Sequence, residues 1–172
     1  MPASLLRTAR KEDLPRIVEI YNAAIPSRVS TADLEPVTVA GRRKWFEAHD
    51  AQRPIWVHED GGRVSAWAAL SPYHERAAYG KTAEVSLYLA PEVQGRGLGR
   101  GILQEVLERA SVLGVETLLA LVFGHNPASL KLFQRAGFEE WGRLPGVAEL
   151  DGNKRDLLFL GRRLIPTSRI HW

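Results

Sequence analysis

Residues Glu84–Leu103 read EVSLYLAPEVQGRGLGRGIL, and this stretch decides the fold. Val85–Leu89 is apolar and β-prone, Pro91 follows its end, and a glycine-rich turn then leads into an amphipathic helix pattern. Such a turn points backbone N–H groups at one anion, and the positive end of the helix dipole favours negative charge there. Arg96 and Arg100 add positive charge. The stretch therefore predicts a phosphate-bearing ligand at the start of the helix.

The glycine spacing shows which of the known phosphate-binding loop patterns this turn matches. A Walker loop needs its last glycine to be followed by lysine and then Ser or Thr, and no lysine follows any glycine of this turn. A dinucleotide fingerprint fails because its last glycine would fall on Arg100 or Ile102. What remains is Q-x-x-G-x-G, made by Gln94, Gly97 and Gly99. This pattern resembles the loop with which the GCN5-related N-acetyltransferase (GNAT) family binds the pyrophosphate of acetyl-CoA. The alternative is a glycine-rich turn without a ligand.

Composition predicts one soluble domain over residues 1–172, with a core of about 4–163 and a tail at 164–172. The net charge of +3 is modest and no block of like charge occurs, so no nucleic-acid partner is expected. The absence of cysteine excludes disulfides and thiol catalysis. Scattered histidines predict no metal site. Without a secretory signal or a membrane-spanning run, we expect no membrane association and a cytoplasmic protein.

The rest of the chain alternates extended and helical patterns. Strands are expected at Leu5–Thr8, Ile55–His58, Val64–Leu70, Val85–Leu89, Glu116–Phe123, and twice within Phe138–Arg163 around the turn Asp151-Gly152-Asn153. Helices are expected after the caps Asp13 and Thr38, from the glycine turn to about Leu113, and over Asn126–Arg135, with loops at Ser27–Pro36 and Ser71–Lys81. The order β-α-α-β-β-β-α-β-α-β-β indicates a mixed α/β (α+β) fold. The GNAT resemblance implies a mixed sheet of about seven strands with helices on both faces.

A second motif begins at Asn126, 27 residues after Gly99. Residues Asn126–Phe138, NPASLKLFQRAGF, resemble the second GNAT signature. The resemblance implies that Asn126 binds the pantetheine arm of acetyl-CoA, that Ser129 opens a helix against it, and that Phe133 lies near the thiol. A helix capped by Asn126 with Phe133 in the core is the simpler interpretation. The two motifs in this order, with a buried strand between them, favour an acetyltransferase.

The block Tyr73–Leu89 narrows the resemblance to the phosphinothricin and methionine-sulfone N-acetyltransferases, and similarity extends from Leu5 to about Arg163. It implies acetyl transfer from acetyl-CoA to the α-amino group of a small amino-acid-like substrate, and it suggests a homodimer. His74 and Gly80 stand where that subfamily has arginines. Arg76 is retained and can pair with an anionic substrate group.

The resemblance also implies roles for individual residues. Glu84 is the candidate general base, because an ammonium must lose a proton before it attacks. The acetyl-CoA site comprises Leu87, Tyr88, Leu89, Gln94, Gly95, Arg96, Gly97, Leu98, Gly99, Asn126, Ser129 and Phe133. Backbone N–H groups of its first three members would also bind the oxyanion. The substrate site comprises Thr31, Asp33, Tyr73, His74, Arg76, Tyr79 and Glu84.

The proton for the leaving thiolate has no obvious source, because Phe133 stands where many acetyltransferases have a tyrosine. Tyr88 is the candidate catalytic donor, with Tyr79 as an alternative; packing is a competing role for both. The thiolate can also leave unaided. His125 precedes the second motif and is a further candidate for substrate contact. Two other functions stay open: an acetyltransferase for another amine, such as a protein N-terminus or an aminoglycoside, and a CoA-binding sensor without turnover.

Overall fold

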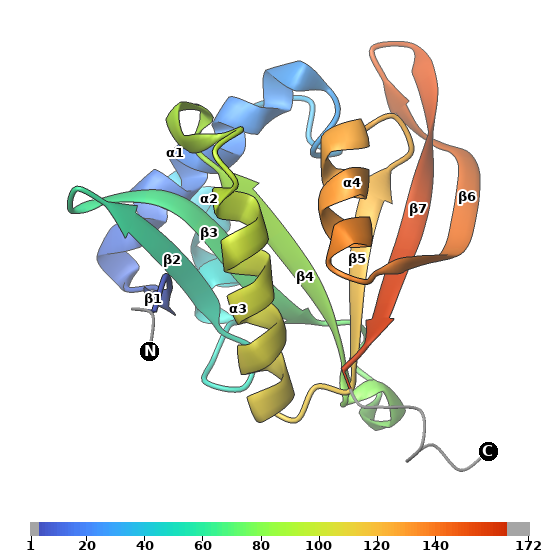
Figure 1. The fold of residues 1–172 in the computed structure, drawn as a ribbon. Coiled ribbons are helices and arrows are strands. Elements are labelled where there is room, and N and C mark those ends of the chain that lie inside the picture. Colours follow the sequence, from blue (N-terminus) through green and yellow to red (C-terminus); the bar gives the residue numbers. More distant parts are fainter. Residues whose placement is uncertain (1–3, 165–172) are drawn as a thin grey trace.

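The computed structural model describes residues 4–164, which form a seven-stranded sheet in the order β1-β2-β3-β4-β5-β7-β6 (Figure 1). Neighbouring strands are antiparallel except β4 and β5, which are parallel. The strands are Arg7–Thr8 (β1), Ile55–Asp60 (β2), Arg63–Pro72 (β3), Thr82–Leu89 (β4), Thr117–Phe123 (β5), Glu139–Leu150 (β6) and Asn153–Arg163 (β7).

Helices cover both faces of this sheet. One face carries α1 (Leu14–Ala24) and α2 (Val39–Glu47), and the other carries α3 (Leu98–Val112) and α4 (Pro127–Arg135). Alternation along β3 explains both cores, because successive side chains of a strand point to opposite faces. Ala66, Ala68 and Leu70 join the core under α3 and α4, whereas Trp67 and Ala69 join the core under α1. The mixed sheet and the predicted order of elements are therefore confirmed.

The predicted element ends are close to the observed ones, and the main differences are in the strands. The first strand is shorter than expected, and β2, β3 and β4 are longer. The capping prediction for Thr38 is confirmed, because its Oγ1 accepts the backbone N–H of Gly41 at 2.9 Å. Asp13 occupies the N-cap position of α1, as predicted, but its side chain makes no capping hydrogen bond to that helix. Its carboxylate accepts the N–H of Arg10 at 2.7 Å, because a 3₁₀ turn precedes α1 and Asp13 ends that turn.

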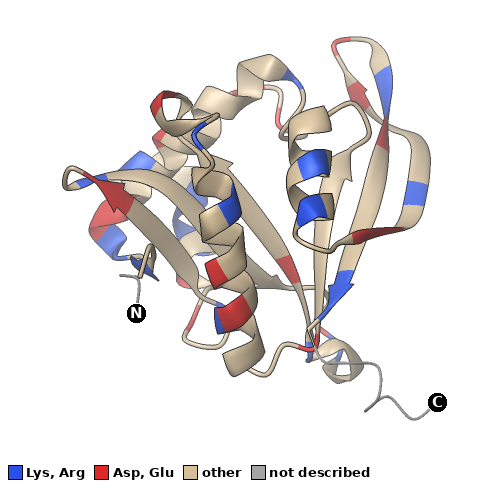
Figure 2. Cartoon of the chain, in the orientation of Figure 1, with Lys and Arg blue, Asp and Glu red and all other residues tan. Residues whose placement is uncertain are grey.

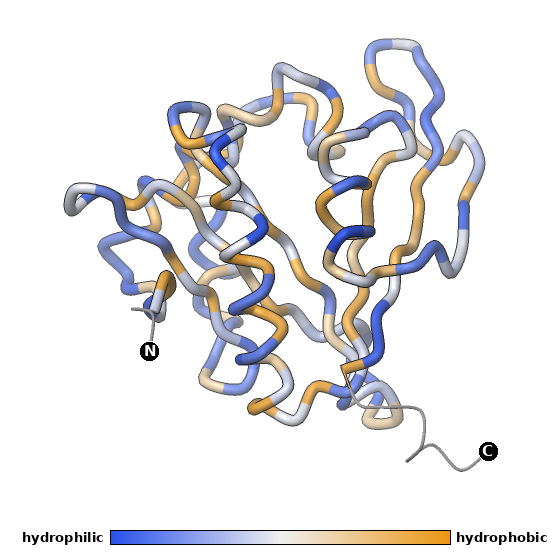
Figure 3. Tube along the Cα trace, in the orientation of Figure 1, coloured by the Kyte–Doolittle hydropathy of each residue, from blue (hydrophilic) through white to orange (hydrophobic). Residues whose placement is uncertain are grey.

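The end of the described chain is tied to the core. The backbone N–H of Leu164 donates to the carbonyl of Glu116 at 2.9 Å, so this first residue of the predicted tail packs beside β5. The rest of that tail, residues 165–172, lies outside the described residues. β5 is apolar along nearly its whole length (Figure 3), and Leu118, Ala120 and Val122 of this strand belong to the core under α3 and α4.

The two parallel strands in the middle of the sheet separate along their length. Only Thr82, Ala83 and Glu84 of β4 pair with β5, opposite Thr117–Leu119. Beyond them the strands diverge, with α3 following β4 and α4 following β5 (Figure 1). β4 stays paired with β3 over its whole length. Half of β4 therefore presents one free edge inside the sheet, between the two helices that follow the diverging strands.

Candidate functional site

The free edge of β4 presents backbone groups of known direction. The N–H of Ala90 donates to Ser65 in β3 at 2.8 Å, so even-numbered residues of β4 face β3. The N–H and C=O groups of Leu87 and Leu89 consequently face the side from which β5 has diverged. The carbonyl of Leu89 accepts the side-chain amide of Gln94 at 3.0 Å, which agrees with this direction. The two amides are thus available to pair with an extended ligand as an added strand would.

The glycine turn lies at the end of this edge. Gly95 and Gly97 have φ angles of 73° and 80°, a left-handed region that favours glycine. Gly97 immediately precedes α3, so N–H groups of the first helical turn are exposed beside it. A Cβ on Gly99 would lie 3.6 to 3.8 Å from the side chains of Leu132 and Leu89, an ordinary contact distance, so the start of α3 packs beside both β4 and α4 at this position.

Two arginines accompany this turn, and both are exposed. Arg96 lies within the turn and Arg100 in the first turn of α3. Leu98 is half-buried and packs against both cores, which anchors the helix start. The turn therefore combines oriented N–H groups with positive charge, the combination that binds phosphate groups.

Glu84 is the only charged residue of β4 (Figure 2). Its side chain is half-buried, on the sheet face that carries α1 and α2, at the last residue where β4 and β5 pair. Burial raises the pKa of its carboxyl group, because desolvation penalises the charged form. A carboxyl group with a raised pKa beside an open strand edge has the properties of a general base.

Tyr88 occupies the same face as Glu84, four residues along. Its ring stacks on Trp67 at 4.8 Å between centroids and meets Tyr21 edge-on at 5.1 Å. Its hydroxyl donates to the carbonyl of Ser30 at 3.1 Å, and burial raises its pKa. The packing interpretation of Tyr88 is thus realised, and its role as a proton donor stays a prediction.

The loop that follows α1 is held over the diverging strands by three side chains. His125 Nε2 donates to the carbonyl of Arg28 at 2.7 Å, and Asn126 Nδ2 donates to that of Val29 at 3.0 Å. With the Tyr88 bond to Ser30, three consecutive carbonyls are fixed. The loop thereby joins β4 to the connection between β5 and α4.

Thr31 and Asp33 extend this loop toward α1, as the predicted substrate site requires. Both bind the hydroxyl of Tyr21, and Arg42 Nη2 lies 3.3 Å from Asp33 Oδ2. The Arg42 guanidinium also stacks over the Tyr21 ring at 4.5 Å. Neither Tyr21 nor Arg42 is among the substrate residues that the sequence predicts. Tyr21 is expected on the packed face of a helix, and Arg42 is one of 23 basic residues.

Three residues of the second motif serve the fold. Asn126 is 5% exposed, and its Oδ1 caps α4 by accepting the N–H of Ser129 at 3.1 Å. Phe133 is 6% exposed and meets Phe138 edge-on at 5.0 Å. The simpler interpretation of this motif is therefore present in the structure. Contact of Asn126, Ser129 and Phe133 with acetyl-CoA stays a prediction.

The remaining predicted substrate residues form a separate exposed cluster after β3. The ring of Tyr79 lies 5.5 Å from Tyr73 and 5.2 Å from His74, whose Nδ1 accepts the N–H of Arg76 at 3.2 Å. Tyr73 pairs with Thr82 at the start of β4, whereas the loop of Thr31 lies near its end. Six residues of strand, about 20 Å, separate the two groups. One chain does not bring them together.

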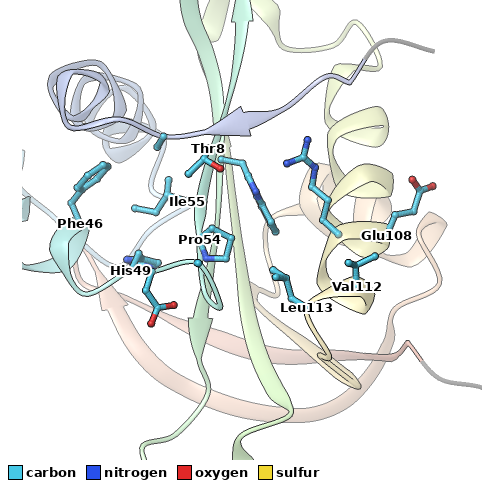
Figure 4. Close-up of a pocket in the computed structure, with 13 residues that line it drawn as sticks. Thr8, Phe46, His49, Pro54, Ile55, Glu108, Val112 and Leu113 are labelled. Atoms are coloured by element: carbon cyan, nitrogen blue, oxygen red, sulfur yellow. The ribbon is translucent and has the colours of Figure 1, made fainter. Parts of the chain in front are cut away.

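A cavity of about 610 Å³ lies elsewhere, where β1 and β2 meet the ends of α2 and α3 (Figure 4). Its walls are mainly apolar, and none of the predicted site residues lines it. Within residues 4–164, no helix is long and apolar enough to cross a membrane, and no cluster of three metal-binding side chains occurs.

The family model described as acetyltransferase (GNAT) family matches residues 14–138, which span the open strand edge, the glycine turn and the second motif. The chain belongs to the GNAT family. Among its relatives, YwnH of Bacillus subtilis, named as a candidate phosphinothricin acetyltransferase, is 50% identical over 160 residues, covering 92% of this chain and 98% of YwnH. The L-methionine sulfoximine/L-methionine sulfone acetyltransferase of Pseudomonas aeruginosa is 36% identical, covering 97% and 98%.

A solved GNAT structure agrees with this fold over the same region. The phosphinothricin acetyltransferase of Sinorhizobium meliloti, solved in complex with acetyl-CoA, superposes with a TM-score of 0.87 at 32% identity. The match covers 95% of this chain and 89% of that one. The resemblance to the GNAT family and to this subfamily is therefore confirmed, and so is the GNAT fold.

The raised pKa of Glu84 predicts a pH-dependent effect on stability. Between its unfolded and folded pKa values the folded GNAT domain binds the extra proton, so stability falls as pH rises through this window and stays lower above it. Glu84→Gln removes this penalty. We expect urea unfolding to show that the variant is more stable than the wild type at pH 8. The difference should vanish at pH values below the ordinary pKa of a glutamate side chain. A variant less stable at pH 8 would show that the carboxylate is favourably solvated or paired.

Proposed function

We propose that this GNAT protein is an acetyl-CoA-dependent N-acetyltransferase that acetylates the α-amino group of a small amino-acid-like acceptor. The observation that carries the proposal is the open edge of β4, which runs from Glu84 past two free backbone amides into the glycine turn. The names of the phosphinothricin and methionine sulfoximine/sulfone acetyltransferases support the acceptor class. The absence of an apolar helix of spanning length in residues 4–164 is compatible with a cytoplasmic location.

Acetyl-CoA fits the residues along this edge. The amides of Leu87 and Leu89 would pair with the pantetheine arm and stabilise negative charge that develops on the acyl oxygen. The N–H groups from Gly95 to Gly99 and the start of α3, with the charge of Arg96, would hold the pyrophosphate. When bound, acetyl-CoA supplies the activated acyl group, and the chain supplies orientation and charge.

Glu84 would make the acceptor reactive. An α-ammonium has no lone pair, so the acceptor must lose a proton before it attacks the thioester. A carboxylate whose pKa is raised by burial accepts that proton more readily than an ordinary surface glutamate would. The position of Glu84 at the last paired residue of β4 puts it at the closed end of the free edge.

The acceptor would bind on the face that carries Tyr21, Thr31, Asp33 and Tyr88. We include Arg42 in this site, because its guanidinium lies against both Asp33 and the Tyr21 ring. The exposed cluster of Tyr73, His74, Arg76 and Tyr79 would provide a second set of contacts, supplied by a partner chain.

A homodimer would bring the second set to the site. The sheet face opposite α4 is apolar where no helix of residues 4–164 covers it. Leu144, Leu157, Phe159 and Trp141 lie on this face, with Trp141 44% exposed and packed over Gly161. Apolar surface of this kind marks association sites.

Light scattering of the purified chain tests the dimer. We expect twice the chain mass of 19.2 kDa at micromolar concentration, because burial of the apolar face favours association. Trp141→Asp should shift the protein to the monomer. A wild-type mass equal to that of one chain would contradict the proposal that a partner chain contributes to the substrate site.

A thiol-release assay with acetyl-CoA tests the function itself. The panel is phosphinothricin, methionine sulfone, methionine sulfoximine, ordinary amino acids, an aminoglycoside and a peptide. We expect turnover with the amino-acid-like acceptors and a fall in kcat of about 10²-fold or more in Glu84→Gln, since general bases contribute this much. The loss should be largest near neutral pH, while affinity for acetyl-CoA is retained.

The other outcomes identify the alternatives. Turnover restricted to the peptide or the aminoglycoside would replace the proposed acceptor class. Tight CoA binding with no turnover of any amine would support a sensor. An unchanged pH–rate profile in Glu84→Gln would remove this residue from the base role.

A further inference from the structure

We propose that Ser71 and His49 form a proton relay that carries the proton collected by Glu84 to the cavity at the edge of β1 and β2. This inference rests on the proposed function and adds the route by which the site resets. Neither residue belongs to the predicted catalytic or binding sets, and His49 lies after the end of α2, outside the glycine turn and the second motif.

Acetyl transfer leaves one proton to be removed in each turnover. The acceptor ammonium gives its first proton to Glu84, and its nitrogen then forms the amide bond as the carbon–sulfur bond breaks. A second nitrogen proton balances the charge of the departing thiolate, giving the free thiol. Glu84 is left protonated and must lose this proton before the next acceptor binds. A base on a half-buried strand face therefore requires an outlet.

Ser71 is the polar neighbour of Glu84 across the sheet. The β3–β4 register sets the two residues directly opposite each other, and opposed residues project from the same face. Their Cβ atoms are consequently about 5 Å apart. A serine hydroxyl at this separation receives a proton from a carboxylic acid directly or through one bridging water. The other neighbour of Glu84, on β5, is Leu119, which exchanges no proton.

His49 continues the path because its tautomer is fixed. Nδ1 lies 2.8 Å from the carbonyl of Trp45, and a carbonyl only accepts, so Nδ1 carries the hydrogen. Nε2 therefore presents a lone pair, and it lies 3.2 Å from Ser71 Oγ. The hydroxyl donates to this nitrogen. As Ser71 takes the proton of Glu84, it passes its own proton to Nε2. The resulting imidazolium then loses the Nε2 proton to water, which restores the Nδ1–H tautomer held by the carbonyl of Trp45.

The cavity provides the exit. His49 is one of its lining residues, and Figure 4 shows its ring beside Pro54 and Ile55. The charged groups that line the same cavity are Asp50, Glu108 and Arg109. Arg109 is paired with Glu105 at 2.7 Å, which leaves the two cavity carboxylates to attract a departing proton.

The acidities of the two ends are suited to transfer. Burial raises the pKa of Glu84 and lowers the pKa of His49, so the two values approach each other. A proton moves between groups of similar pKa at little cost in free energy. The shifts thus lower the cost of passing a proton between the two groups, and the geometry, with the cavity beside His49, sets the direction.

The chain provides a matched control in a second histidine–serine pair. His58 Nδ1 lies 2.8 Å from Ser65 Oγ on the neighbouring strand. Ser65 is opposite Ala90, so no acid follows it, and His58 does not line the cavity. Replacing this pair changes a similar hydrogen bond on the same sheet without touching the relay.

The experiment compares His49→Gln, Ser71→Ala and His58→Gln with the wild type at saturating acceptor and acetyl-CoA. In dilute buffer we expect kcat to fall about tenfold in the first two variants, less than the 10²-fold or more that loss of a general base costs, since water partly replaces a relay. KM for acetyl-CoA should not change. High concentrations of imidazole should restore kcat in His49→Ala, and His58→Gln should match the wild type throughout.

Two results would overturn the relay. One is wild-type kcat in dilute buffer in His49→Gln or Ser71→Ala, an equal loss in His58→Gln, or a loss in His49→Ala that imidazole does not restore. The other needs no activity: nitrogen NMR of the wild type at neutral pH that finds the hydrogen of His49 on Nε2, which cannot then accept from Ser71. Absence of wild-type turnover with every amine would refute the proposed function, whereas the tautomer measurement addresses the relay separately.

Discussion

The separation of β4 from β5 is the constraint on which the rest of the structure depends. Three residues of parallel pairing hold the strands together at one end, and beyond them β4 has a partner on one side only. Unpaired backbone amides inside a sheet are costly unless water or a ligand satisfies them. The fold thus maintains a binding edge, with amides spaced at every second residue, that an extended amide-containing ligand can complete.

The other elements hold the glycine turn, the loop after α1 and Glu84 in place around this edge. The start of α3 packs beside Leu89 and Leu132 at Gly99, which holds the glycine turn at the end of the edge. His125, Asn126 and Tyr88 hold the loop after α1 across the diverging strands. Glu84 closes the opposite end and remains half-buried. The proposed exit through Ser71 and His49 connects that end to the cavity and not to the acetyl-CoA edge.

The sequence predicted the fold because its signals are local. Turn glycines, alternating strands and an amphipathic helix determine the order of elements, and the spacing of the two motifs indicates the GNAT family. What it missed depends on distant contacts. Asp13 stands at the predicted N-cap position, but its carboxylate binds the N–H of Arg10 in the preceding 3₁₀ turn and does not cap α1, which the local pattern could not show. The contacts of Tyr21 and Arg42 with Asp33, and of His49 with Ser71, could not be predicted, since each joins segments that only tertiary packing brings together. The predicted roles of the site residues remain to be tested.

Amide hydrogen exchange with and without acetyl-CoA tests the central claim most directly. The amides of Leu87 and Leu89 face the free edge, whereas those of Ser86 and Tyr88 face β3 and provide internal controls on the same strand. We predict that saturating acetyl-CoA slows exchange at 87 and 89 strongly and leaves 86 and 88, already protected, nearly unchanged. Bound acetyl-CoA with no added protection at 87 and 89 would contradict the account, because the ligand would then bind without completing the edge of β4.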